Sequence, residues 1–160
     1  MTVFSVKISS TLPVDKQTLW RHMTSMEGVN FELQPYLHMT FPATHSNLTT
    51  ISRSNLGLTL FASILLLFMY IPVDLHWLRL VDVQEGEGFH EHSCSLLQQY
   101  WKHERYLVKG EEGSDCTQLV DEVEFCPRIT FLGYLLKPVV KAIFRHRHIQ
   151  LQKKFQQPSS

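Results

Sequence analysis

The feature that most constrains the fold of this chain is an alternation of side chains, with a period of two, in residues 89–105 and 117–125. Because successive side chains of a β-strand point to opposite faces, this period predicts strands of one sheet. One face would carry Phe89, Glu91, Ser93, Trp101, His103, Arg105, Leu119, Asp121, Val123 and Phe125. The opposite, more polar and solvent-exposed face would carry His90, His92, Cys94, Lys102, Glu104, Glu122 and Glu124. Large apolar groups mixed with charges predict a pocket wall, because charges are rarely buried unless they are paired or meet a ligand.

The turn at residues 110–115 is too short for a parallel crossover, so we expect the strands on its two sides to be antiparallel. A hairpin that is symmetric about this turn places three pairs opposite each other: Arg105 and Asp121, His103 and Val123, and Trp101 and Phe125. The arginine and the aspartate would then form a partly desolvated ion pair on the inner face.

The charged residues of this face have two interpretations; they are Glu91, His103, Arg105 and Asp121. In the first, they anchor the polar end of an apolar ligand. The ligand-binding set then also includes Phe89, Trp101, Val123 and Phe125. In the second, they form a structural ion-pair network that ties neighbouring strands together. His103 is also a candidate general acid or base, although no nucleophile with an oxyanion-stabilising partner accompanies it.

The rest of the chain predicts a strand at each end of two short helices, and one long helix at the C-terminus. The expected elements, in order, are strand 3–10, helices 14–23 and 25–33, strand 37–41, loop 42–55, strand 74–83, and a helix from about residue 131 or 138 to 155.

Residues 56–71 are almost wholly apolar. The run has 16 residues, fewer than the ~20 that cross a bilayer as a helix, and Gly57, Thr59 and Ser63 interrupt it. We therefore expect a buried or cavity-covering helix here. The alternative is a segment in contact with a membrane, since so apolar a stretch must be covered by something.

The length of 160 residues fits one domain, which we place at residues 1–156, with a frayed tail at 157–160. Residues 1–124 hold 8 basic and 15 acidic side chains, whereas residues 125–160 hold 7 basic and none acidic. The basic C-terminal helix could contact nucleic acid or an anionic membrane. We favour a solvated face and expect no nucleic-acid partner, because no aromatic residues interleave the cations for base stacking.

The cysteines and histidines indicate neither disulfides nor a metal site. Cys94, Cys116 and Cys126 are odd in number and lack metal-type spacing, which predicts free thiols in a reducing, cytoplasmic setting. The histidine pairs at 90 and 92 and at 146 and 148 lack a third ligand at a suitable spacing. We expect no metal and no cofactor.

A further set of residues is moderately specific when taken together: Trp20, Pro35, Trp101, His103, Arg105, Asp121, Phe125, Pro127 and the run 144–148. With the order of elements, this set resembles the START-like (Bet v 1-like) superfamily within the broad SRPBCC group, which includes polyketide cyclases and lipid-transfer proteins. The resemblance implies an α+β helix-grip fold, in which a curved antiparallel sheet surrounds the C-terminal helix and leaves a cavity for an apolar ligand. One departure is that residues 42–71 stand where the family usually has further strands, so we treat the apolar run at 56–71 as an insert.

The expected function is therefore the binding of an apolar or amphipathic small molecule, or a lipid, between the sheet and the C-terminal helix. Two alternatives stay open. One is an aromatase/cyclase-like or hydrolase-like enzyme that uses His103. The other is a membrane-docking or interaction module that uses residues 56–71. We also consider that the protein forms a homodimer.

Overall fold

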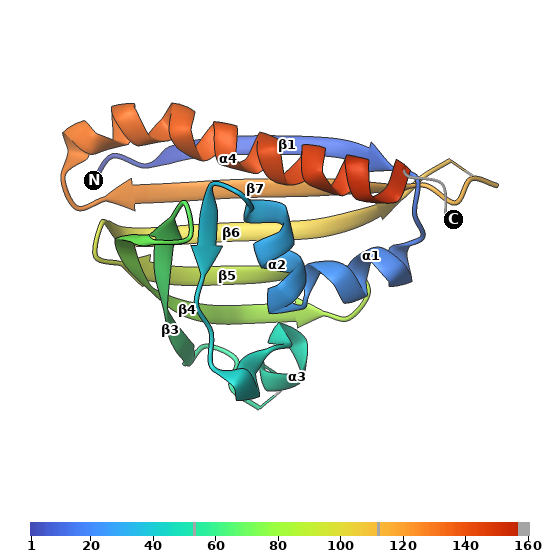
Figure 1. Cartoon of the computed structure of the whole chain (residues 1–160), viewed down its shortest axis with the longest axis horizontal. Coiled ribbons are helices and arrows are strands. Elements are labelled where there is room, and N and C mark those ends of the chain that lie inside the picture. The colour runs from blue at the N-terminus through green and yellow to red at the C-terminus, as the bar shows by residue number, and fades with distance from the viewer. Residues whose placement is uncertain (53, 112, 157–160) are drawn as a thin grey trace.

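The computed structural model describes residues 1–52, 54–111 and 113–156, and it contains a strongly curved antiparallel sheet (Figure 1). The sheet has seven strands in the order β1-β7-β6-β5-β4-β3-β2. The strands are β1 Phe4–Leu12, β2 Leu37–Met39, β3 Thr59–Leu67, β4 Ile71–Gln84, β5 Gly88–Ser95, β6 Gln98–Lys109 and β7 Thr117–Pro127. Consecutive strands from β2 to β7 are neighbours, and β1 closes the far edge beside β7.

In the described part of the chain, four α-helices accompany the sheet: α1 Lys16–Met23, α2 Met26–Leu33, α3 Leu48–Ser52 and α4 Thr130–Gln156. The first two begin where their caps predict, because Asp15 accepts a hydrogen bond from the Thr18 amide (2.9 Å) and Ser25 accepts one from the Gly28 amide (3.0 Å). Helix α4 packs along β1 and β7, and α2 lies against it (Figure 1).

The predicted register of the last hairpin is confirmed. Strands β6 and β7 pair antiparallel with Arg105 opposite Asp121, His103 opposite Val123 and Trp101 opposite Phe125. The inner-face residues assigned on these strands are buried apart from the half-buried Trp101. The assigned residues of opposite parity are half-buried or exposed, namely Lys102, Glu104, Glu122 and Glu124, although Val120 and Cys126 of that parity are buried. The period of two therefore gave the correct face for every residue of the hairpin that it assigned.

The prediction of a helix at residues 56–71 is wrong, because this run contains strand β3, a tight turn and the first residue of β4. Phe61 and Ser63 point inward, but Ile64 and Leu66 on the opposite parity are apolar too. Without a polar face the period of two is invisible in the sequence. The run is thus no insert, and its strand completes the sheet where the family has further strands.

Two further boundaries differ from the prediction. The expected loop 42–55 contains a 3₁₀ turn at Ala43–His45 and helix α3, at whose start Asn47 accepts hydrogen bonds from the Thr49 and Thr50 amides. Helix α4 begins at Thr130 and continues through Pro138. The predicted tail at 157–160 lies outside the described residues.

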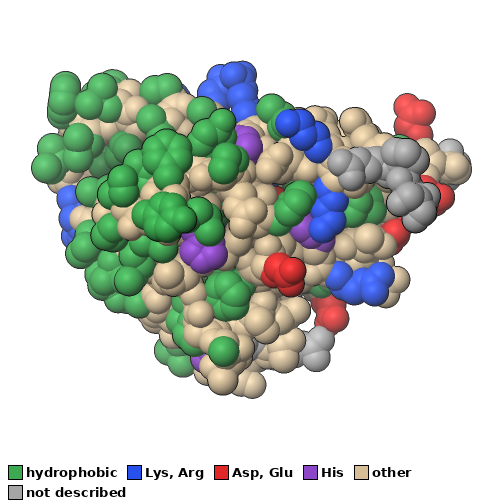
Figure 2. Space-filling model, in the orientation of Figure 1, with side chains coloured by type: hydrophobic (Ala, Val, Ile, Leu, Met, Phe, Trp, Pro, Cys, Tyr) green, Lys and Arg blue, Asp and Glu red, His purple; other side chains and the backbone are tan. Residues whose placement is uncertain are grey.

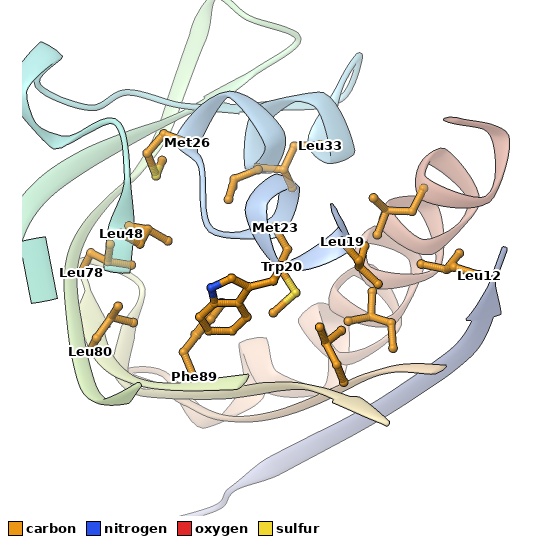
Figure 3. Close-up of a cluster of buried hydrophobic side chains, with 14 of the residues drawn as sticks. Leu12, Leu19, Trp20, Met23, Met26, Leu33, Leu48, Leu78, Leu80 and Phe89 are labelled. Carbon is orange, nitrogen blue, oxygen red and sulfur yellow. The ribbon is translucent and has the colours of Figure 1, made fainter. Parts of the chain in front are cut away.

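A large apolar core lies between the sheet and helices α1 and α2. Figure 3 shows the labelled side chains of these helices, such as Trp20 and Met26, pointing toward Leu78, Leu80 and Phe89 of the sheet. A second buried cluster joins β1, β7 and α4 and consists of Phe4, Val6, Val123, Phe125, Val140 and Phe144. The close approach of α4 to β1 requires a glycine, because a Cβ atom at Gly133 would lie 1.9 Å from Cε2 of Phe4.

Candidate functional site

A cavity of about 440 Å³ lies between the inner face of the sheet and helices α2 and α4. Its walls are mainly apolar and include Leu78, Leu80, Ile143 and Phe144. The cavity reaches the surface, since its lining also includes side chains that are partly in solvent: Tyr36, Val73, Leu97 and Val139. The structure therefore contains a hydrophobic pocket with an opening between the sheet and the two helices.

Four of the eight predicted site residues line this cavity: Phe89, Glu91, Trp101 and His103. The other four do not. Val123 and Phe125 pack in the cluster between the sheet and α4, and Arg105 and Asp121 lie in a buried ion-pair network behind the wall.

Arg105 is the centre of that network and is 0% exposed. Its guanidinium makes a bidentate contact with Asp121, with Nε to Oδ1 at 2.7 Å and Nη2 to Oδ2 at 2.9 Å. On its other side, Nη2 lies 2.7 Å from Oε1 of Glu32, and Arg147 Nε donates to the same oxygen at 3.1 Å. The network thus joins strands β6 and β7 to helix α2 through Glu32 and to helix α4 through Arg147.

Asp121 also accepts hydrogen bonds from two imidazoles, with His103 Nε2 2.6 Å from Oδ1 and His148 Nε2 2.8 Å from Oδ2. Burial alone would raise the pKa of Asp121, but the Arg105 guanidinium and these two imidazoles hold that pKa well below its ordinary value. Asp121 is therefore a buried, ionised carboxylate with all of its neighbours acting as donors.

A second carboxylate, Glu91, lies in the cavity wall. Its Oε1 accepts hydrogen bonds from His76 Nε2 (2.7 Å) and Ser93 Oγ (2.6 Å), and its Oε2 lies 3.6 Å from His103 Nδ1. Burial would raise the pKa of Glu91, yet the hydrogen bonds and charges of His103 and His76 lower it overall. Both ring nitrogens of His103 thus face carboxylate oxygens, an arrangement that fits the protonated imidazolium.

The buried charges balance if one histidine carries a proton. The carboxylates are Glu32, Glu91 and Asp121, and the guanidiniums are Arg105 and Arg147. If His103 carries this proton, the three negative and three positive charges sum to zero. His148 then fits a neutral ring, because its Nε2–H donates to Asp121 while its Nδ1 accepts from Ser10 Oγ at 2.5 Å. Burial and the neighbouring Arg105 lower the pKa of Arg147, which Glu32 partly offsets.

The sequence analysis did not assign Glu32, His76, Arg147 or His148 to the site. Glu32 lies on a short helix that is distant in sequence, and only the fold brings it to Arg105. His76 lies on β4, within a stretch expected to be a strand, and its inward parity was the signal that could have identified it.

Neither a metal cluster nor a membrane-spanning helix is found in the described part of the chain. Within residues 1–52, 54–111 and 113–156, no group of three His, Cys, Asp or Glu side chains is arranged to hold a metal ion. No helix of these residues is long and apolar enough to span a membrane.

Solved structures of three proteins share this architecture. A START superfamily protein from Mycobacterium smegmatis superimposes with a TM-score of 0.66 at 10% identity, over 95% of this chain and 97% of the other. Zhui aromatase/cyclase from Streptomyces sp. R1128 superimposes with a TM-score of 0.66 at 10% identity, over 97% of this chain and 94% of the other. Ara h 8.0201 superimposes with a TM-score of 0.57 at 11% identity, over 94% of this chain and 98% of the other. At these identities the likeness concerns the fold alone, and that fold is the START-like (Bet v 1-like) helix grip expected from the sequence.

The sequence places the chain more narrowly than the fold does. Residues 10–155 match the family described as Domain of unknown function (DUF8410), and the chain belongs to this family. No curated protein matches the sequence.

Proposed function

We propose that the protein binds an apolar or amphipathic small molecule non-covalently in the cavity between the sheet and α4. The observation that carries this proposal is the cavity itself, whose volume of about 440 Å³ falls within the ~300–1,000 Å³ of small-molecule sites. Burial of apolar ligand surface, worth about 25 cal/mol per Å², would supply the affinity. The polar groups in the wall would set the orientation of the ligand.

In this proposal Arg105 and Asp121 act on the ligand indirectly. They lie behind the wall, but Asp121 holds His103 and Arg105 holds Glu32, which in turn contacts Arg147. The ion pair would therefore fix the position and charge of His103 and Arg147, the two cationic groups that line the cavity. This combines the two interpretations of the sequence, since one network would serve both the fold and the ligand.

A pair of neighbouring substitutions on β3 tests the binding proposal. Leu65 lines the cavity, whereas the side chain of Leu66 has the opposite parity and lies outside the lining. We expect Leu65→Trp to fill part of the cavity and to abolish the binding of an apolar fluorescent probe such as pyrene, and Leu66→Trp to retain it. Equal binding by both variants would contradict a site in this cavity. Native mass spectrometry of the purified protein would identify a ligand that is retained from the host.

The geometry around His103 supports binding more than acid–base catalysis. Its Nε2 contacts Asp121 and its Nδ1 faces Glu91, so neither nitrogen offers a lone pair to a substrate. An enzyme of the aromatase/cyclase class remains the catalytic alternative. Turnover of a polyketide-type substrate that collapses in His103→Ala, while pyrene binding persists, would establish it.

A second candidate function is docking of the cavity mouth on an anionic lipid bilayer. Exposed apolar side chains gather on the half of the molecule that holds the N-terminal part of α4 and the β3–β4 hairpin (Figure 2). They include Phe68, Met69, Tyr70 and Ile71 at the hairpin, and Phe131, Tyr134, Leu135 and Val139 on α4. Val139 also lines the cavity, so the patch is continuous with its mouth.

Two features favour a bilayer as the partner of this patch. Lys137, Lys141 and Arg145 are exposed, recur every four residues beside the apolar stripe of α4, and meet no acidic residue on that helix. Phe68 and Met69 have φ angles of 50° and 72°, a left-handed conformation that bulky residues adopt at a cost. Large apolar side chains at such a turn indicate that the hairpin tip itself makes a contact.

Vesicle flotation tests the docking proposal. We expect the protein to float with vesicles of phosphatidylcholine and phosphatidylserine, and less with phosphatidylcholine alone. Tyr70→Asp should abolish flotation, whereas Leu58→Asp is the matched control, since Leu58 is exposed and lies before β3, at the end opposite the hairpin tip. Self-association through the patch, measured by light scattering in the absence of lipid and lost in Tyr70→Asp, would instead assign this face to a homodimer.

A further inference from the structure

Gln98, at the first position of β6, presents an unsatisfied polar atom within an apolar cavity. Its side chain lines the cavity and is only 7% exposed. Its Oε1 is buried and accepts no hydrogen bond within the described part of the chain. Its backbone amide donates to Ser95 Oγ (3.0 Å), which fixes the start of the strand. Buried acceptors are normally paired, so an orphan acceptor in a cavity wall points to a donor that arrives with a ligand.

His76 supplies a second polar atom in the same part of the wall. It lies opposite Ser95 in the β4–β5 ladder and packs edge-on against Trp101, with the ring centroids 6.2 Å apart. Its Nε2 is engaged by Glu91 Oε1, and its Nδ1 has no hydrogen-bond partner within residues 1–52, 54–111 and 113–156. Because Nε2 is engaged by Glu91, Nδ1 is the ring nitrogen that is left to meet a ligand.

The groups in this wall favour a neutral partner over an anionic one. Glu91, which is hydrogen-bonded to His76, and Asp74 are both lining residues. The cationic lining groups are already engaged, His103 by Asp121 and Glu91 and Arg147 by Glu32. A carboxylate or phosphate placed beside Gln98 Oε1 would bring an acceptor to an acceptor, whereas a neutral hydroxyl would bring a proton that this oxygen can accept.

We propose that the ligand carries an alcoholic or phenolic hydroxyl and that Gln98 and His76 recognise it. The hydroxyl donates its proton to Gln98 Oε1 or His76 Nδ1 and accepts from the side-chain Nε2–H of Gln98. The apolar body of the ligand fills the rest of the cavity. This inference rests on the proposed binding function and narrows it to uncharged hydroxylated hydrophobes.

Four fluorescent probes of similar size test the inference: pyrene, 1-hydroxypyrene, 1-methoxypyrene and 1-pyrenecarboxylate. We expect 1-hydroxypyrene to bind the wild-type protein about tenfold more tightly than 1-methoxypyrene, as one or two neutral hydrogen bonds predict. The carboxylate should bind more weakly than either. In Gln98→Leu and in His76→Phe the ratio between the hydroxyl and methoxy probes should fall toward one, and the affinity of each variant for pyrene measures how far the substitution alters the apolar part of the cavity.

The neighbouring substitution Gln99→Leu is the matched control, because Gln99 is exposed on the opposite face, and it should keep the tenfold ratio. If the wild-type protein binds all four probes equally, or binds the carboxylate best, the hydroxyl inference is wrong although the cavity does bind ligands. If it binds none of them, the binding function itself is wrong and the inference fails with it. The wild-type series decides the question even if a variant does not fold.

Discussion

The strongest test of the buried network is the substitution Glu32→Gln, which keeps the size of the side chain and removes its charge. Glu32 is 0% exposed and faces two guanidiniums, with Arg105 Nη2 at 2.7 Å and Arg147 Nε at 3.1 Å. Loss of one partner from a buried ion pair leaves an uncompensated charge and costs about 3–5 kcal/mol. A domain of this size has a free energy of unfolding of about 5–15 kcal/mol in total, so the variant should lose a large share of it.

Urea denaturation followed by tryptophan fluorescence at pH 7 measures this loss. With a slope of about 2 kcal/mol per molar urea, the midpoint should fall by roughly 1.5–2.5 M. Glu124→Gln, on the exposed face of β7, is the control and should change the free energy of unfolding by less than about 0.5 kcal/mol. Adding Arg147→Met to Glu32→Gln removes the excess positive charge and should restore part of the stability. If Glu32→Gln costs no more than Glu124→Gln, the network does not hold the fold in the way described.

Three further predictions concern stability. The pKa of Asp121 is lowered in the folded state, so ionised Asp121 stabilises the fold. This stabilisation is fully present above the ordinary carboxyl pKa of about 4 and is lost as the pH falls below it. Below that pH the free energy of unfolding should drop more steeply for the wild type than for Asp121→Asn. Gly133→Ala should destabilise the protein by about 1–3 kcal/mol in the same urea assay because of its clash with Phe4, and a Phe4→Leu background should reduce that cost. Replacing Phe68 and Met69 by Asn and Gly should raise the thermal midpoint, since both positions have positive φ; an unchanged or lower midpoint would show that the native turn is not strained.

The parts of the fold that the sequence predicted are those where one face of a strand differs chemically from the other. Strands β6 and β7 alternate between charged residues on the outer face and a mixture of apolar and charged residues on the inner face. This alternation, with the short turn, predicted the pairing of Arg105 with Asp121. Strand β3 carries apolar residues on both faces, so neither parity nor length distinguished it from a buried helix. Its conformation is determined by pairing with β4, which is a tertiary effect.

The site was predictable only where its residues are close in sequence. Glu91 and His103 lie on adjacent strands, and their shared parity brought them to one wall. Glu32 and Arg147 lie on two different helices and are 115 residues apart in the sequence. Only the packing of α2 against α4 makes them neighbours, and no local pattern records it.

The path of the buried ion pairs has a mechanical consequence. Because Arg105 connects Glu32 and Asp121, and Glu32 connects to Arg147, movement of α2 or α4 away from the sheet at this point would pull opposite charges apart in a medium of low dielectric constant. At the mouth, by contrast, the lining residues Tyr36, Val73 and Val139 are partly exposed, and no ion pair among the residues that the structure describes ties them to the network. The ion pairs therefore tie the helices to the sheet at the charged end of the interior, and the hairpin end lacks this restraint.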